Sequence, residues 1–195
     1  MGLRRHSYRV VVLGASRGGT KAMSYLLSAL PADFPFPIAM VIHRDPASDV
    51  PLRDVLQNQS LLPVLEAEDK MAIEPGHVYL APANYHLLVG GPEFSLSTEG
   101  PVLCARPSID VLFESAGNTH GRATIAILLT GASSDGALGS ASIRERGGYV
   151  IVQDPASAES ATMPQAAIAA AAQSIVLPLA QIPGCLSKLA EVMDE

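Results

Sequence analysis

The chain is poor in the features that mark disulfide-rich, metal-binding and membrane proteins. Its 195 residues include only two cysteines, Cys104 and Cys185, without Cys-x-x-Cys or histidine spacing. We expect both to be free thiols in a reducing compartment. No apolar run reaches the roughly 18–20 residues of a membrane helix. The stretch after Arg4 and Arg5 is too short for a signal peptide. These absences predict a cytoplasmic protein without membrane insertion.

Basic residues are also scarce. Thirteen Lys and Arg stand against nineteen Asp and Glu, giving a net charge of −6, and no block of five or more basic residues occurs. Because binding to nucleic acid needs clustered positive charge, we expect no nucleic-acid partner. No pair of histidines has metal-ligand spacing with a third ligand, so we expect neither a metal nor another cofactor.

Apolar residues make up 48% of the chain and charged residues 16%, so many elements must be covered on both sides. This balance favours a mainly parallel sheet between helices. Strands are expected at 9–14, 38–43, 64–67, 126–130, 149–152 and 175–177, and helices at 19–30, 52–59, 109–116, 136–146, 164–172 and 181–193. Short runs at 77–81, 86–89 and 93–97, separated by proline and glycine, are typical of antiparallel hairpins. We predict one α/β domain over residues 1–195: a doubly wound, mainly parallel sheet with helices on both faces and an antiparallel hairpin insertion.

Ser16 follows the first apolar run directly, in the segment Gly14-Ala15-Ser16-Arg17-Gly18-Gly19. This order predicts a tight reversal from a strand into a helix, with the serine hydroxyl beside the positive end of that helix. His43 and Asp135 also come at or just past the ends of predicted strands. Because the carboxyl ends of parallel strands meet at one edge of a sheet, the three side chains are expected to assemble a nucleophile there.

Other interpretations of the serine segment remain open at this point. A dinucleotide-binding turn fits poorly, because Ser16 replaces the middle glycine of G-x-G-x-x-G. The segment fits the G-x-S-x-G nucleophile elbow, yet α/β-hydrolases place several strands before it and order their triad as serine, acid, histidine. Ser16 could also be a structural turn residue, His43 a structural histidine, and Asp135 a cap of the next helix.

Six motifs in order carry a resemblance that covers about residues 10–189. They lie at 14–20, 42–43, 75–82, 106–113, 129–137 and 163–164. The chain resembles the catalytic domain of the chemotaxis protein-glutamate methylesterases, which hydrolyse glutamate methyl esters on chemoreceptors and, in some members, deamidate receptor glutamines. The resemblance implies that Ser16 is the nucleophile, His43 the general base and Asp135 the residue that orients it. It also implies that the partner is the methylated cytoplasmic region of chemoreceptors.

The chain departs from the family pattern near these residues. Arg17 stands where the family usually has threonine, residues 131–133 are Gly-Ala-Ser instead of Gly-Met-Gly, and residues 44–46 replace a Met-Pro pair. These changes leave open a serine esterase of another substrate, or a non-catalytic receptor-binding module. About eight residues precede the first strand, where the family often has a receiver domain. This predicts a stand-alone esterase, an enzyme that works beside separate signalling proteins, or a truncated chain.

The resemblance and the predicted topology together outline a shallow, open crevice. We expect backbone N–H groups near the start of the first helix, and that of Ala132, to stabilise an oxyanion. The 44–51 loop and the 77–97 hairpins are expected to form its walls.

Overall fold

A parallel sheet of seven strands organises the protein. The computed structural model describes residues 10–43 and 51–191. The strand order is β3-β4-β2-β1-β7-β8-β9, and every pairing in this sheet is parallel. In sheet order the strands are β3 (Val64–Glu66), β4 (Val78–Leu80), β2 (Ile38–Ile42), β1 (Val10–Ala15), β7 (Thr124–Leu128), β8 (Tyr149–Gln153) and β9 (Ile175–Leu177).

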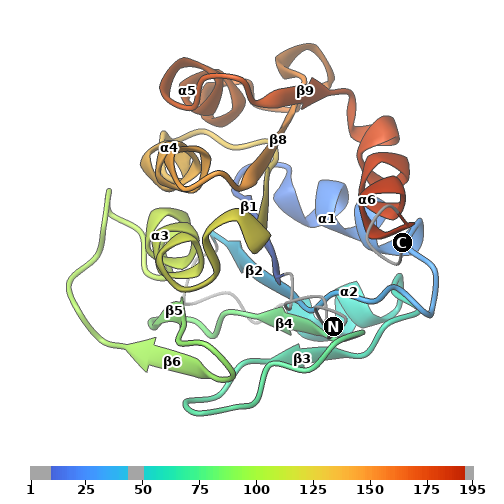
Figure 1. The fold of residues 1–195 in the computed structure, drawn as a ribbon, viewed down its shortest axis with the longest axis vertical. Coiled ribbons are helices and arrows are strands. Elements are labelled where there is room, and N and C mark those ends of the chain that lie inside the picture. The colour runs from blue at the N-terminus through green and yellow to red at the C-terminus, as the bar shows by residue number, and fades with distance from the viewer. Residues whose placement is uncertain (1–9, 44–50, 192–195) are drawn as a thin grey trace, which may run out of the picture.

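The three central strands are apolar along their whole length because both of their faces are covered. Every residue of β1, β2 and β7 is buried. Figure 1 shows α3 (Ile109–His120), α4 (Ala137–Glu145) and α5 (Thr162–Ala170) on one side of the sheet, with α1 (Gly19–Ser28) and α6 (Ile182–Glu191) on the other. The side chains of β1 alternate accordingly: Val11 and Leu13 pack in one apolar cluster and Val10 and Val12 in the other. The short helix α2 (Leu52–Gln57) contributes to the α1 side. The predicted doubly wound α/β architecture is confirmed.

The predicted hairpin region is only partly correct. Residues 77–81 were expected in an antiparallel hairpin, but β4 is a parallel strand between β3 and β2, with Val78 opposite both Val64 and Ile38. All three residues of β4 are buried, as suits a strand inside a parallel sheet. The antiparallel insertion is therefore limited to β5 (His86–Val89) and β6 (Phe94–Ser97), which form a separate two-stranded sheet.

The order of the strands reverses at β1. The chain continues from β1 to β2 on one side, and β7 is added later on the other side. Ala15 pairs with Ile42, and Gly14 pairs with Leu128. The segments that follow β1, β2 and β7 therefore lie side by side at one edge of the sheet, where doubly wound folds bind their ligands.

Within the ranges that the structure describes, we find no helix of the length and hydropathy that a bilayer span requires.

Candidate active site

Ser16 lies in a tight turn between β1 and α1. Its backbone N–H donates to Thr130 O at 2.9 Å, and the N–H of Gly19 donates to Ser16 O at 2.7 Å. This second bond closes a turn in which Gly18 has φ 76° and ψ −1°, a left-handed conformation that favours glycine. A Cβ at Gly18 would also lie only 2.8 Å from side-chain atoms of Glu159. The glycine therefore lets the chain turn so that the partly exposed Ser16 lies at the start of α1.

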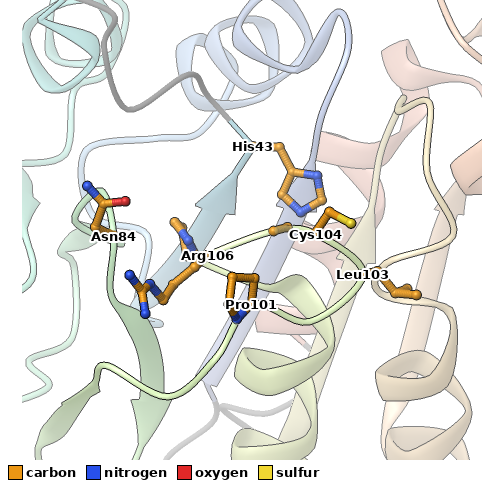
Figure 2. A pocket seen from close by; sticks show the side chains of 8 residues that line it. His43, Asn84, Pro101, Leu103, Cys104 and Arg106 are labelled. Carbon is orange, nitrogen blue, oxygen red and sulfur yellow. The ribbon is translucent and has the colours of Figure 1, made fainter.

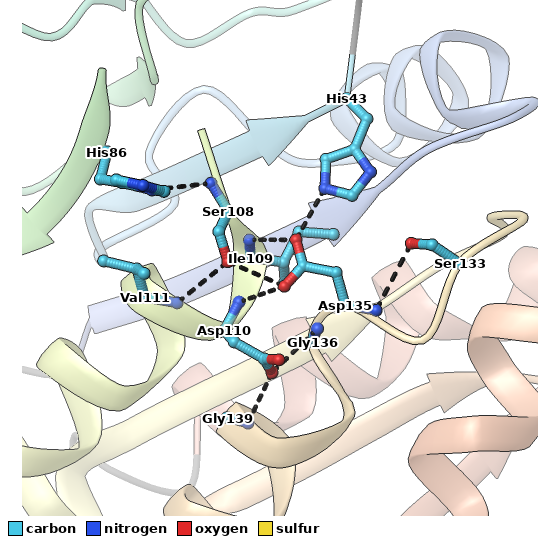
Figure 3. Close-up of polar contacts among 10 residues, drawn as sticks. All are labelled: His43, His86, Ser108, Ile109, Asp110, Val111, Ser133, Asp135, Gly136 and Gly139. Carbon is cyan, nitrogen blue, oxygen red and sulfur yellow. Dashed lines mark hydrogen bonds and ion pairs between the residues drawn. The ribbon is translucent and has the colours of Figure 1, made fainter. Parts of the chain in front are cut away.

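His43 lies next to Ser16 across the sheet. The backbone N–H of His43 donates to Ala15 O at 3.1 Å, which extends the β1–β2 ladder by one bond. The His43 side chain is 16% exposed, so the ring can reach both the interior and the crevice. Its Nε2 lies 2.7 Å from Asp135 Oδ2 (Figure 3).

Asp135 is fully buried and its carboxylate accepts hydrogen bonds at both oxygens. Besides His43, the backbone N–H of Ile109 donates to Oδ2 at 2.7 Å. The backbone N–H of Asp110 and the hydroxyl of Ser108 donate to Oδ1 at 3.0 and 2.8 Å. Burial alone would raise the pKa of Asp135, but the hydrogen bonds from His43, the two backbone N–H groups and Ser108 outweigh it and lower the pKa. The positive end of α3 favours the same ionised form.

The ionised state of Asp135 fixes which nitrogen of His43 carries the proton. A carboxylate only accepts, so Nε2 must be the donor and Nδ1 keeps the lone pair that a general base needs. The hydrogen bond predicted between Ser16 Oγ and His43 is not formed among the residues that the structure describes. Such bonds are often long without substrate and shorten in the reacting complex, so this contact stays a prediction.

A second layer of hydrogen bonds holds Ser108 toward Asp135. The backbone N–H of Ser108 donates to Nδ1 of His86 at 3.2 Å. Nε2 of His86 lies 3.1 Å from Gly100 O and must donate to it, since a carbonyl oxygen only accepts. His86 is 1% exposed and forms a fixed bridge between the 100–108 segment and the site.

The segment after β7 is hydrogen-bonded to the Ser16 turn and to residues 160–163. The hydroxyl of Thr130 donates to Arg17 O at 2.9 Å, Gly131 N donates to Ser160 O at 3.1 Å, and Met163 N donates to Gly131 O at 2.9 Å. In the described part of the chain, the backbone N–H groups of Arg17 and Ala132 have no acceptor. These two donors belong to the segments that the sequence analysis expects to stabilise an oxyanion, and that role stays a prediction.

A cavity of about 310 Å³ opens beside His43 (Figure 2). Its lining residues are His43, Asn84, Pro101, Leu103, Cys104, Ala105, Arg106 and Pro107. Asn84 comes from the 77–97 region that was expected to form a wall, but most of the lining comes from the 101–107 segment, which was not predicted. The remaining expected wall, the 44–51 loop, lies outside the described residues except for Pro51.

The structure brings Ser16, His43 and Asp135 to one edge of the sheet, as their positions after β1, β2 and β7 predict. It also shows hydrogen-bonding residues around Asp135 that the sequence analysis did not assign to the site, namely His86, Ser108 and Asp110. Ser108 and Asp110 lie in the 106–113 motif. The sequence therefore marked this segment but did not indicate that the segment contacts Asp135. In residues 10–43 and 51–191, no group of three or more His, Cys, Asp and Glu side chains could hold a metal ion.

Comparisons with known proteins show the family and the fold of the chain. A family model described as CheB methylesterase matches residues 11–186. A Leptospira interrogans protein is 44% identical over 177 residues, covering 90% of this chain and 92% of that protein. Protein-glutamate methylesterase FrzG of Myxococcus xanthus is 43% identical over 95% of this chain, which spans 56% of FrzG. The crystal structure of the Thermotoga maritima CheB methylesterase catalytic domain superposes with a TM-score of 0.87 at 34% identity, covering 94% of this chain and 99% of that chain.

Proposed function

This chain belongs to the CheB methylesterase family, and we propose that it hydrolyses glutamate methyl esters on chemoreceptors through the triad Ser16, His43 and Asp135. The observation that carries the proposal is the 2.7 Å contact between His43 and the buried Asp135, next to the Ser16 turn. The family assignment makes the protein a carboxylic ester hydrolase, while the roles of the individual residues and the receptor substrate are our inference.

The first half of the reaction forms an acyl-enzyme. Ser16 Oγ attacks the γ-carbonyl carbon of a methylated glutamate, and its proton moves to Nδ1 of His43. Asp135 stabilises the imidazolium through Nε2, and the N–H groups of Arg17 and Ala132 bind the oxyanion. The C–O bond to the methoxy group then breaks, and the proton on His43 leaves with it as methanol.

The second half releases the glutamate. Water attacks the acyl-enzyme while His43 takes its proton, and the same proton returns to Ser16 Oγ as the ester bond breaks. A glutamine side chain would follow the same course with ammonia as the leaving group, so deamidation is a second activity of the same site.

The surroundings of Ser16 suit a macromolecular substrate. The 310 Å³ cavity lies on the His43 side, and a second cavity of about 410 Å³ lies beyond Gly18, lined in part by Lys21, Tyr25 and Glu159. Open space beside His43 and beside Gly18 can take the neighbouring residues of a receptor helix. We propose the methylated cytoplasmic region of chemoreceptors as the partner, with the protein working in the cytoplasm.

The test of this function is the release of labelled methanol from a receptor fragment carrying isotopically labelled methyl esters. A parallel assay with p-nitrophenyl acetate distinguishes the alternatives. Hydrolysis of both substrates, lost in Ser16→Ala, supports the proposal. Hydrolysis of the small ester alone would indicate an esterase of another substrate, and hydrolysis of neither would indicate a binding module.

Arg17 is expected to contribute to the recognition of the receptor. A cation at a helix N-terminus is unfavourable by roughly 0.3–1 kcal/mol, so local stability does not explain this exposed residue. Its planar guanidinium can bind a carboxylate next to the methylated glutamate. We expect Arg17→Thr to raise KM for receptor about 3- to 10-fold and to make it less salt-sensitive, with little change on p-nitrophenyl acetate.

Lys188→Thr, which removes an exposed cation from α6, is the matched control and should leave both substrates unchanged. An equal loss on the two substrates in Arg17→Thr would place Arg17 in the chemical step. No change on either would leave it a solvated surface residue.

A further inference from the structure

Two buried carboxylates lie at the starts of α3 and α4, and each caps the helix that begins beside the other. Asp135 directly precedes the first residues of α4 but accepts from the N–H groups of Ile109 and Asp110 in α3. Asp110, in the first turn of α3, accepts at Oδ1 from the N–H groups of Gly136 at 2.9 Å and Gly139 at 2.7 Å in α4 (Figure 3). This crossed arrangement fixes the backbone on both sides of the Asp135 carboxylate.

Close packing of the two helix starts makes this contact possible. A Cβ at Gly139 would lie 2.5 Å from Phe113 Cβ and 3.1 Å from Asp110 O. The missing side chain therefore lets the first turn of α4 approach the first turn of α3 until the Gly139 N–H reaches Asp110.

The second oxygen of the Asp110 carboxylate, Oδ2, caps no helix. Asp110 is 4% exposed, and its Oδ2 is buried without a hydrogen-bond partner among the described residues. Burial, with repulsion by Asp135 and Glu114, raises the pKa of Asp110 to about 6 against the hydrogen bonds from Gly139 and Gly136. The ionised form therefore costs the folded protein free energy at neutral pH. A neutral amide could cap α4 through the same oxygen. Its NH₂ would take the place of the unpartnered Oδ2, and burying that neutral donor costs less than burying a charge there.

The charge of Asp110 lies behind the pair that performs the chemistry. Asp135 faces Asp110 from the start of α4, and His43 lies beyond Asp135 on the end of β2. Glu114 lies on the same helix and is exposed, while both ring nitrogens of His86 of β5 are used in hydrogen bonds with Ser108 and Gly100. The first turn of α4 has no acidic side chain. A positive charge that forms on His43 during the reaction is thus balanced by two carboxylates.

We propose that Asp110 is a positioning residue of the esterase site, which holds the Asp135–Gly136 backbone and adds a second buried negative charge that favours the protonated His43 of the transition state. This inference rests on the proposed function. It predicts an unusual combination: removing the charge while keeping the cap should make the protein more stable and less active. Stability and activity change in opposite directions in this way at sites that are strained for function.

The experiment compares Asp110→Asn, Asp110→Ala and the control Glu114→Gln in the full chain. Activity is the rate at which a fluorophosphonate labels Ser16, where a P–O bond forms, fluoride leaves and the serine proton passes to His43. Stability is the Tm at pH 7.5 and at pH 4.5. Because no receptor is involved, the result does not depend on the identity of the substrate.

Asp110→Asn should label roughly tenfold more slowly than the wild type at pH 7.5, with the acid limb of its rate–pH profile moved to lower pH. Its Tm should be roughly 5 °C higher at pH 7.5. The folded-state pKa is raised, so the wild type loses stability as pH rises through about 6; the Tm difference should therefore shrink toward pH 4.5. Asp110→Ala should lose both rate and stability, and Glu114→Gln neither.

Two outcomes would overturn the role of Asp110. One is an Asp110→Asn variant that labels at the wild-type rate with an unchanged pH profile, and the other is a variant with a lower Tm at pH 7.5, which would make the residue a structural cap only. A wild type in which Ser16 is not labelled at all would instead overturn the proposed function, and this inference with it.

Discussion

Ser16→Ala is expected to lower kcat for ester hydrolysis by roughly 10⁴- to 10⁶-fold, and His43→Ala by a similar factor. Each substitution removes one member of a unit: without the hydroxyl no acyl-enzyme forms, and without the imidazole no group takes its proton. The double variant should therefore be little slower than either single one. Strong non-additivity of this kind distinguishes a coupled nucleophile and base from two residues that act independently.

The measurement is single-turnover release of labelled methanol, with the folded state checked by circular dichroism. Ser134→Ala is a suitable control because Ser134 is exposed in the loop after β7 and lies next to Asp135 in the chain. It should retain activity within about twofold. Activity retained in Ser16→Ala would show that another nucleophile performs the reaction. Losses that add in the double variant would separate His43 from the step that Ser16 carries out.

The edge of the sheet at which the site lies could be predicted because the signal is local. Each of Ser16, His43 and Asp135 comes shortly after an apolar run that is buried as a central strand. Strands of a doubly wound sheet run in one direction, so their ends meet whatever their separation in sequence. The same logic predicted the helices on both faces from the apolar content of the strands.

The position of β4 could not be predicted in this way. Its three residues follow a turn signal and precede Pro82, which is also the pattern of a hairpin strand. Such a run can pair with the next strand in sequence or enter a parallel sheet. The outcome depends on which strands lie on either side of it in the fold. Here Val78 pairs with Val64 and Ile38 and completes the sheet between them.

The hydrogen-bond partners of Asp135 could not be predicted from the sequence for a related reason. Ser108 could be predicted as a helix cap, and it does accept from the Val111 N–H at 3.4 Å. The Ser108 hydroxyl and the next two backbone N–H groups donate to the Asp135 carboxylate, which lies 25 to 27 residues away in the chain. These contacts depend on the packing of α3 against α4. Sequence patterns within one helix carry no information on that contact.

Asp135→Asn is expected to lower kcat by roughly 10³- to 10⁴-fold, less than Ser16→Ala, because nucleophile and base remain while the base loses its orientation. Stability should also fall, for a reason specific to this site. Backbone N–H groups face both carboxylate oxygens, Ile109 at Oδ2 and Asp110 at Oδ1. An amide NH₂ would oppose one of them in either orientation. Leaving buried donors unpaired costs about 1–3 kcal/mol each.

The pH dependence of this loss separates Asp135 from Asp110. The pKa of Asp135 is lowered in the folded state, so its ionised form stabilises the protein above the ordinary value of 3.8 and this contribution is lost as pH falls through the folded-state pKa. The Tm deficit of Asp135→Asn should therefore be largest near pH 7 and smaller in acid, the opposite sign to the gain expected for Asp110→Asn. Asp154→Asn, which alters a carboxylate that caps a short 3-10 helix after β8, should leave kcat unchanged. A Tm for Asp135→Asn equal to that of the wild type at pH 7 would contradict the donor arrangement, and an unchanged kcat would remove Asp135 from the triad.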